Sequence, residues 1–416
     1  MSSTFSIALS ALQAQSEAIN ATSNNLANVN TVGFKGSNVD FQDALSQSLS
    51  GVQIGMGVSK AITVQQFSQG SLQSSSSPLA AAIEGDGFFV LKGSSGQQMF
   101  TRDGDFTLDS SGVLKTQTGE SVQGWMADSN GNVSSNGALT NISLPVGQVL
   151  PPKPTGSLSI SANLNSATDA TSPNATFSVP IQVVDSLGSM HTLTMSFTKS
   201  SSTPDTWSYQ VTIPGADVNS ASSSVSVAGP GTLTFNSDGT LNTTGITSPV
   251  SIAVNGLADG AANMSINWNL LNPDGTGALT QFAQTSALSS STQDGAQAAE
   301  LSGFSVEQGG NIVATFSNGQ TKVEAQLALA GITNPTSLEN AGNNNFIVSG
   351  DTATPVFGAA NTGGRGQIES GQIEGSNVDL AAQFSNLIVY QSAYQASSKI
   401  ITTADQMTQE LLSLIH

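Results

Sequence analysis

The chain has 416 residues, 28 of them acidic and 10 basic, and its formal net charge is −18. Only 9% of its residues are charged, so Ser, Thr, Asn, Gln and Gly must form most of the surface. The acidic balance and the lack of any Lys/Arg cluster exclude nucleic-acid binding through phosphate contacts, and the absence of Cys excludes disulfides and thiolate metal sites.

The N-terminal segment lacks the features of a standard secretory signal. Its first basic residue is Lys35, and no continuous apolar run precedes it. No stretch of the chain reaches the roughly 20 apolar residues that a membrane helix needs. We therefore expect no membrane insertion, and a location that is either cytoplasmic or reached by a route that reads no cleaved signal.

The first predicted element is a helix over residues 4–29, because residues 1–32 contain neither Gly nor Pro and Gly33 follows as a stop signal. Its apolar residues recur every seven positions, at Phe5, Leu12, Ile19 and Leu26. Glu17 is the only charged side chain before Lys35, whereas a solvent-facing helix normally carries Lys and Glu on its outer face. A helix that lacks them is marginal alone, so we expect burial in an assembly rather than a place on the surface of a globular domain.

The middle of the chain is predicted to be β structure. Residues 33–78 are rich in Gly and are expected to be irregular and extended, with one strand within residues 58–67. Alternating and β-branched residues then follow, separated by Asp-Gly, Ser-Gly and Asn-Gly turns, and prolines from Pro145 to Pro154 mark a domain boundary. Strands are expected at residues 88–91, 99–101, 106–108, 113–114, 122–126, 177–184, 190–198, 207–213, 232–235, 250–254, 264–271, 303–307, 311–316, 322–328 and 346–348.

A second helix is predicted at the end of the chain, after a Gly-rich connector over residues 363–375. Residues 376–416 contain neither Gly nor Pro, and Asn377 and Asp379 stand where N-caps are expected. Two series with seven-residue spacing run through it: Leu380, Leu387, Tyr394, Ile401, Thr408 and Ile415 in the first, and Phe384, Gln391, Ser398, Asp405 and Leu412 in the second. Together they form an a/d heptad pattern, which is typical of a helix that packs against another helix.

The two heptad-bearing ends are complementary, so we predict that they meet. The expected fold is multi-domain α+β, with the N- and C-terminal helices paired as a coiled-coil-like domain and nested all-β domains, sandwich-like or barrel-like, between them. The predicted parts are residues 1–32 with 376–416 as the helical assembly domain, 33–78 with 363–375 as an extended connector, 79–146 with 289–362 as a first β domain, and 147–288 as an inserted outer β domain.

Catalytic chemistry is not indicated anywhere in the sequence. The two histidines, His191 and His416, have no partner at metal-ligand or triad spacing, and we interpret both as exposed or edge residues. Ser196–Lys199 fits an S-x-x-K motif but lies in a strand pattern without K-T-G elsewhere. Residues 128–132 resemble part of a calcium loop but lack its Gly and closing Glu, which favours a hairpin turn. We predict no catalytic, cofactor or metal site.

Three segments resemble signature motifs of the bacterial flagellar rod and hook family. They are residues 24–35, residues 100–114 around the Phe-Thr-Arg-Asp-Gly-Asp-Phe sequence, and residues 371–399. Residues 147–288 match no motif. The positions that carry the terminal signatures are Asn24, Asn25, Leu26, Ala27, Asn28, Gly33, Phe34, Lys35, Ser376, Asn377, Val378, Asp379, Tyr394 and Gln395.

The resemblance implies a structural subunit that polymerises into a curved, flexible helical tube outside the cell and transmits torque from rod to filament. It implies export through the flagellar type III apparatus and contacts with rod, hook cap and hook–filament junction proteins, without a cofactor. The chain length and the large insertion favour the hook branch over the shorter rod branch. The residues expected to carry assembly are Phe5, Leu12, Ile19, Leu26, Leu380, Phe384, Leu387, Tyr394, Ile401, Leu412 and Ile415.

Other functions remain open at this point. A distal rod or hook–filament junction protein would share the terminal signatures. A secreted β-rich adhesin could use the two helices as a coiled-coil stalk, and an enzyme would require a polar pocket that the sequence does not indicate.

Overall fold

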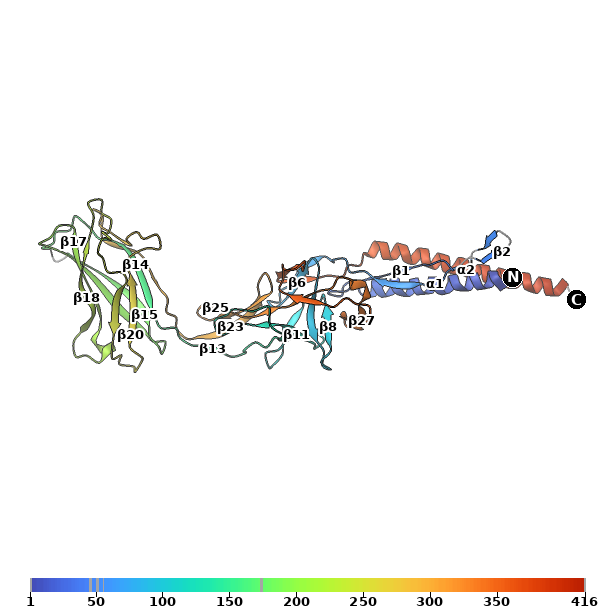
Figure 1. The fold of residues 1–416 in the computed structure, drawn as a ribbon, viewed down its shortest axis with the longest axis horizontal. Helices are drawn as coiled ribbons and strands as arrows, with labels where there is room; N and C mark the ends of the chain where they lie inside the picture. The colour runs from blue at the N-terminus through green and yellow to red at the C-terminus, as the bar shows by residue number, and fades with distance from the viewer. Residues whose placement is uncertain (1, 45–46, 50–51, 55, 173–174, 415–416) are drawn as a thin grey trace. The chain divides into compact units, whose positions relative to one another are not determined.

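The computed structural model describes residues 2–44, 47–49, 52–54, 56–172 and 175–414. Two compact units divide the chain: unit 1 comprises residues 1–146, 303–315 and 321–416, and unit 2 comprises residues 147–302 and 316–320. The elements are mostly strands, with one long helix at each end of the chain (Figure 1). The chain is thus mostly β, with an N-terminal and a C-terminal helix and several β-sheet regions.

The two helices of unit 1 lie side by side (Figure 1). They are α1 (Ser2–Ala27) and α2 (Leu380–Leu414). The carboxylate of Asp379 accepts hydrogen bonds from the N–H groups of Ala381 (2.8 Å) and Ala382 (3.2 Å), which confirms Asp379 as the N-cap of α2. Over the part of the chain that the structure describes, neither helix combines the length and apolarity that crossing a membrane requires.

Short strands make up the rest of unit 1, and its main sheet has the strand order β24-β25-β11-β7-β8-β28-β27. Strand β7 lies near its middle because Phe88–Leu91 are four consecutive apolar residues, a pattern that requires cover on both faces. The elements are β1 (Ser37–Asp40), β2 (Gln47–Leu49), β3 (Val52–Ile54), β4 (Ile62–Gln65), β5 (Leu72–Ser74), β6 (Ala81–Glu84), β7 (Phe88–Lys92), β8 (Gln98–Thr101), β9 (Phe106–Leu108), β10 (Leu114–Thr116), β11 (Ser121–Met126), β12 (Thr140–Asn141), β24 (Asn311–Phe316), β25 (Thr321–Leu327), β26 (Leu329–Gly331), η2 (Pro335–Ser337), β27 (Glu339–Gly342), β28 (Asn345–Ile347), β29 (Val356–Gly358), β30 (Gln367–Ser370) and β31 (Gln372–Glu374), with β23 (Ala299–Val306) at the boundary of the two units.

The predicted Gly-rich connectors are more ordered than expected. Strand β31 pairs antiparallel with β5, and β30 pairs antiparallel with β6. Strand β1 pairs with β4 in the same way. The prediction of an irregular connector is therefore wrong for these residues. Strand β31 finds its partner in the other connector, β30 pairs with a strand just beyond that connector, and β1 and β4 pair within the first connector.

Unit 2 consists of two sheets around one apolar core, as in a β-sandwich. One sheet has the order β15-β16-β17-β18, and the other has the order β19-β20-β14-β21 with β22 paired to β14. Strand β16 shows why this packing forms, since Leu193, Met195 and Phe197 alternate with polar residues and point into the core. The elements are β13 (Val149–Leu150), β14 (Ser157–Asn163), β15 (Thr176–Val184), β16 (Met190–Lys199), β17 (Thr206–Pro214), η1 (Gly215–Val218), β18 (Ser224–Thr234), β19 (Val250–Val254), β20 (Met264–Asn269), β21 (Leu279–Thr280) and β22 (Ala287–Gln293).

Strand β22 shows that the predicted end of the inserted β domain is misplaced. The insertion was expected to end at residue 288, but β22 continues to Gln293 and pairs with β14 of unit 2 along its length. The predicted boundary is therefore wrong. The sequence did not indicate this strand because β22 is a Ser-rich edge strand with every residue exposed, so it lacks the alternation that marks a half-buried strand.

Residues 128–132 form the expected turn: the carboxylate of Asp128 accepts hydrogen bonds from the N–H groups of Asn130 and Asn132.

We predict that Phe197→Ala destabilises unit 2 by about 3–5 kcal/mol, because it removes a fully buried ring that packs edge-on against Trp268. Differential scanning calorimetry of the full chain should show a lower unfolding temperature for unit 2. Phe282→Ala in the same unit is the control, since that ring is 46% exposed and its loss should cost no more than about 0.5 kcal/mol. Equal effects of both variants would contradict this description of the core.

Candidate functional site

A half-buried stripe follows the length of α2. Its members are Gln383, Leu387, Tyr390, Ala393, Ser397, Ile401, Ala404 and Thr408. At its first residue the stripe contacts α1, where Asn25 Nδ2 donates a hydrogen bond to Gln383 Oε1 (3.2 Å). It contains Leu387, Ile401 and Thr408 of the first predicted series. In this stripe the neighbours of Leu387 are Gln383, four residues before it, and Tyr390, three residues after it. The prediction placed Phe384 and Gln391, three before and four after, in those positions.

A second set of apolar residues on α2 is exposed. It consists of Leu380, Phe384, Ile388, Val389, Tyr394, Ile400 and Met407. Ile388 and Val389 are 64% and 61% exposed. We call these seven residues the outer face of α2. Seven large apolar side chains exposed on one helix are unusual on a monomeric protein and indicate an interaction surface.

The buried side of α1 is built from small and polar residues. These are Ala8, Ala14, Ala18, Thr22 and Asn25. The larger residues of the predicted series stand beside them: Leu12, Ile19 and Leu26 are half-buried, and Phe5 is exposed. Large apolar side chains on both helices therefore keep accessible surface. The side chain of Leu412, and Ile415 as a whole, lie outside the described residues.

A buried carboxylate, Glu374, joins the helices to the main sheet of unit 1. Its Oε1 accepts hydrogen bonds from Lys35 Nζ (2.6 Å) and from the Gly70 N–H (2.8 Å), and its Oε2 lies 3.2 Å from Arg102 Nη1. The side chains of Glu374 and Lys35 are fully buried, and that of Arg102 is 4% exposed. We call Glu374, Lys35 and Arg102 the junction cluster.

Both cations of the junction cluster make further contacts. Lys35 Nζ donates to the Ser68 carbonyl (2.8 Å). Arg102 Nη2 donates to the Gly85 carbonyl (2.8 Å), and the guanidinium lies over the Phe88 ring, 5.3 Å from its centre. Arg102 Nε is buried and finds no hydrogen-bond partner among the described residues. Burial lowers the pKa of both cations, and the nearby Glu374 carboxylate opposes that effect.

Gly33 completes the junction with its backbone. Its N–H donates to the Glu374 carbonyl (2.7 Å), and its φ is +67°. A Cβ at this position would lie 2.6 Å from the backbone nitrogen of Asp103, closer than any real contact. Only Gly therefore fits at this position. Gly33 thus both follows the end of the first helix and belongs to the junction.

Two asparagine side chains clamp the chain segments that enter the junction. Asn25 of α1 bonds both backbone groups of Ser37, with its Oδ1 accepting from N–H (2.9 Å) and its Nδ2 donating to the carbonyl (2.7 Å). Asn377 accepts from the Gly36 N–H (2.8 Å) and donates to the Gln66 carbonyl (2.8 Å). The expectation that Asn377 stands in a capping position is wrong, because its amide is used to hold the β1 and β4 region.

The remaining signature positions have simpler places. Phe34 is buried, Leu26 and Val378 are half-buried, and Ser376 Oγ accepts from the Val378 N–H. Asn28 Nδ2 donates to the Asn24 carbonyl and so closes the last turn of α1. Ala27, Tyr394 and Gln395 are exposed. Sequence reasoning did not select Glu374 and Arg102 as site residues, although charged residues inside Gly-rich segments of a charge-poor chain were a usable signal.

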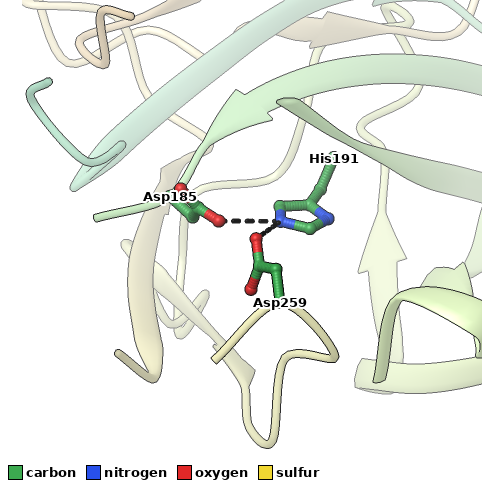
Figure 2. A group of neighbouring side chains, drawn as sticks. All are labelled: Asp185, His191 and Asp259. Carbon is green, nitrogen blue, oxygen red and sulfur yellow. Dashed lines mark hydrogen bonds and ion pairs between the residues drawn. The ribbon is translucent and has the colours of Figure 1, made fainter. Parts of the chain in front are cut away.

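The interpretation of His191 as an exposed or edge residue is wrong. Its ring is buried in unit 2, with Nε2 3.1 Å from Asp185 Oδ2 and Nδ1 3.1 Å from Asp217 Oδ2 (Figure 2 shows the first pair). The β15–β16 turn folds Asp185 back onto the ring, and η1 supplies Asp217 from further along the chain. No sequence spacing indicates that approach. His416 lies outside the described residues.

We predict that Glu374→Gln destabilises unit 1 by about 3–5 kcal/mol, because it leaves Lys35 and Arg102 buried without a counter-charge. Hydrogen exchange of peptides covering residues 33–37 and 366–377 should accelerate, while unit 2 peptides stay unchanged. Glu307→Gln, an exposed carboxylate of the same unit, is the matched control. Unchanged protection of the junction in Glu374→Gln would refute this role.

We also predict a pH-dependent effect of Asp103→Asn. Burial raises the pKa of Asp103 to about 6, so its ionised form destabilises the fold above pH 6 and this penalty fades as the pH falls toward 4. The amide keeps the acceptor for the Asp105 N–H and removes the charge. The variant should gain about 1–3 kcal/mol at pH 7.5 and much less at pH 4.5, measured by calorimetry against the exposed control Asp351→Asn. A gain that is independent of pH would contradict the assignment.

Family models match four segments of this chain, including both of its helices. The matches are Flagella basal body rod protein (residues 5–35), Flagellar hook protein FlgE/F/G D1 domain (82–165), Flagellar basal body protein FlaE D2 domain (156–296) and Flagellar basal body rod FlgEFG protein C-terminal (369–414). The junction cluster therefore joins residues from the first, second and fourth of these segments.

Individual relatives agree with these models. The chain is 33% identical to the flagellar hook protein FlgE of Treponema pallidum over 98% of both chains. It is 30% identical to that of Escherichia coli over 99% of both chains. The crystal structure of Helicobacter pylori flagellar hook protein FlgE2 is similar in fold, with a TM-score of 0.50 at 15% identity, over 71% of this chain and 99% of that chain. The chain belongs to the flagellar hook protein FlgE family and is a structural subunit of the flagellar hook.

Proposed function

We propose that this subunit polymerises through α1 and α2 into a curved, flexible helical tube that transmits torque from rod to filament. The observation that carries the proposal is the outer face of α2, a series of large apolar side chains exposed over most of the helix. In the polymer these residues pack against helices of neighbouring copies. Burying one such side chain fully contributes about 1.5–3 kcal/mol.

The charge distribution supports packing between copies. The only charged side chains of α2 are Lys399, Asp405 and Glu410, and Glu17 is the only one of α1. Few charges must therefore lose their hydration when helices of several copies come together. The half-buried stripe of α2 follows heptad spacing, which supports a coiled-coil-like pairing of α1 and α2 in the assembled state.

The junction cluster supports torque transmission. A subunit that carries load must pass force from its helices to its sheets, and a flexible link would absorb the displacement. Here the two connectors pair as strands, and Glu374 bonds residues that come before β1, after β4 and after β8. This connection distributes load over buried, directional hydrogen bonds.

We further propose export through the flagellar type III apparatus, a location outside the cell, and contacts with rod, hook cap and hook–filament junction proteins. Membership of the hook family and the terminal helices support these assignments. We propose that α1 and α2 gain much of their order only when copies assemble, because helices with few charges and many Ser, Asn and Gln residues are marginal alone. The chain has no catalytic role in this proposal.

We predict that Ile388→Asp abolishes polymerisation while the monomer keeps its fold, because the new carboxylate would be buried between copies. Sedimentation and negative-stain electron microscopy measure the polymer, and circular dichroism measures the β content. The control Ile388→Leu, which keeps the apolar volume, should form tubes of normal length. Normal tubes from the Ile388→Asp protein would remove the outer face from the assembly mechanism.

A further inference from the structure

One end of unit 2 holds a cluster of ionisable side chains that the hook function does not use. Asp185 follows β15, His191 is the second residue of β16, and Asp217 lies in η1. Asp259 comes from the loop between β19 and β20, which belongs to the other sheet. Figure 2 shows the carboxylates of Asp185 and Asp259 pointing at the same nitrogen of the His191 ring.

The spacing of these atoms is that of ligands around a small metal ion. Nε2 of His191 lies 3.1 Å from Asp185 Oδ2 and 3.7 Å from Asp259 Oδ2. All three residues offer ligand atoms within 4.8 Å of one another. Ligands bound 2.0–2.2 Å from a tetrahedral ion are about 3.3–3.6 Å apart. We propose that Asp185, His191 and Asp259 form a site for a divalent transition-metal ion of the Zn²⁺ type.

The local charge favours a cation. Three carboxylates, those of Asp185, Asp217 and Asp259, approach one imidazole, so at least two negative charges are uncompensated even with the ring protonated. The only lysines of residues 147–302 are Lys153 and Lys199, and there is no Arg in that range. Lys153 pairs with Asp294, and Lys199 donates to backbone carbonyls elsewhere. A divalent ion supplies the missing positive charge.

The surroundings hold the ligands in a binding orientation. Asp217 Oδ2 lies 3.1 Å from His191 Nδ1, so Nδ1 would donate to this carboxylate while Nε2 binds the ion. A carboxylate behind the histidine is the usual support of a metal-bound imidazole. Asp185 Oδ1 accepts from the N–H groups of Leu187 (2.8 Å) and Ser189 (2.9 Å), which leaves Oδ2 directed at the site.

The ligand set indicates which ions fit. One imidazole nitrogen and two carboxylate oxygens suit Zn²⁺ and related ions, with a water in the remaining position. Asp259 is 30% exposed, so water and metal can reach the site. Ca²⁺ prefers six to eight oxygens and does not match an imidazole. The bound ion would link the β15–β16 turn of one sheet to the β19–β20 loop of the other, and so stabilise this end of unit 2.

The test uses full-length protein treated with a chelator, dialysed, and titrated with Zn²⁺ alone by isothermal calorimetry. We expect one equivalent to bind with micromolar or tighter affinity and to raise the unfolding temperature of unit 2. Co²⁺ should bind with a visible absorption band of a four-coordinate site. Asp259→Asn should weaken binding at least tenfold, and Asp217→Asn, which alters only the support of the ring, by about 10–100-fold.

Two controls make the result decisive. His191 is buried and its substitution could unfold unit 2, so the partly exposed Asp259 carries the test, with Trp207 and Trp268 fluorescence reporting the fold. His416 is the only other histidine, and His416→Gln must bind Zn²⁺ as the unmodified chain does. Absence of stoichiometric Zn²⁺ binding, equal binding by Asp259→Asn, or binding of Ca²⁺ in preference to Zn²⁺ and Co²⁺ would each overturn the proposal.

Discussion

The buried carboxylate of Glu374 is the interaction on which the organisation of unit 1 depends. It stands at the end of β31 and bonds Lys35, Gly70 and Arg102, residues that are far apart in the sequence. A buried charge is costly unless its partners surround it, so these segments can fold only together. The helices and the main sheet are thereby joined through one point, and the Gly-rich segments become paired strands instead of loose connectors.

The scarcity of charge has two consequences in this molecule. On the helices, it leaves few charged side chains near the outer face of α2 to oppose packing, and we infer that other copies cover this face. In the interior, the few charged residues are each paired with particular partners. The junction cluster and the carboxylates around His191 are such groups, and folding brings their members together from distant parts of the chain. Over the rest of the surface, uncharged Ser, Thr, Asn and Gln side chains interact with water.

Unit 2 is organised around an apolar core, whereas unit 1 is organised around a buried carboxylate. Its two sheets enclose one apolar core that contains Phe197, Trp207 and Trp268, and this core follows directly from alternating strands. Its charged cluster sits at one end, where β15, β16, η1 and the β19–β20 loop come together. The proposed metal site would tie the two sheets at that end, and it is independent of polymerisation through the helices.

The sequence by itself determined both terminal helices and strands such as β15 and β16 through their periodic patterns, and β7 through its continuous apolar run. It also determined the capping role of Asp379, and the family through its terminal motifs. It did not indicate β22, whose Ser-rich residues are all exposed and lack a clear pattern. Strand β14 was also missed, although Leu158, Ile160 and Ala162 alternate there with polar residues. Only the tertiary structure decided which side of α2 faces α1, since Gln383 and Phe384 are both compatible with heptad spacing. The junction cluster and the carboxylates around His191 depend on contacts between residues distant in the chain, and a local pattern carries no information about such contacts.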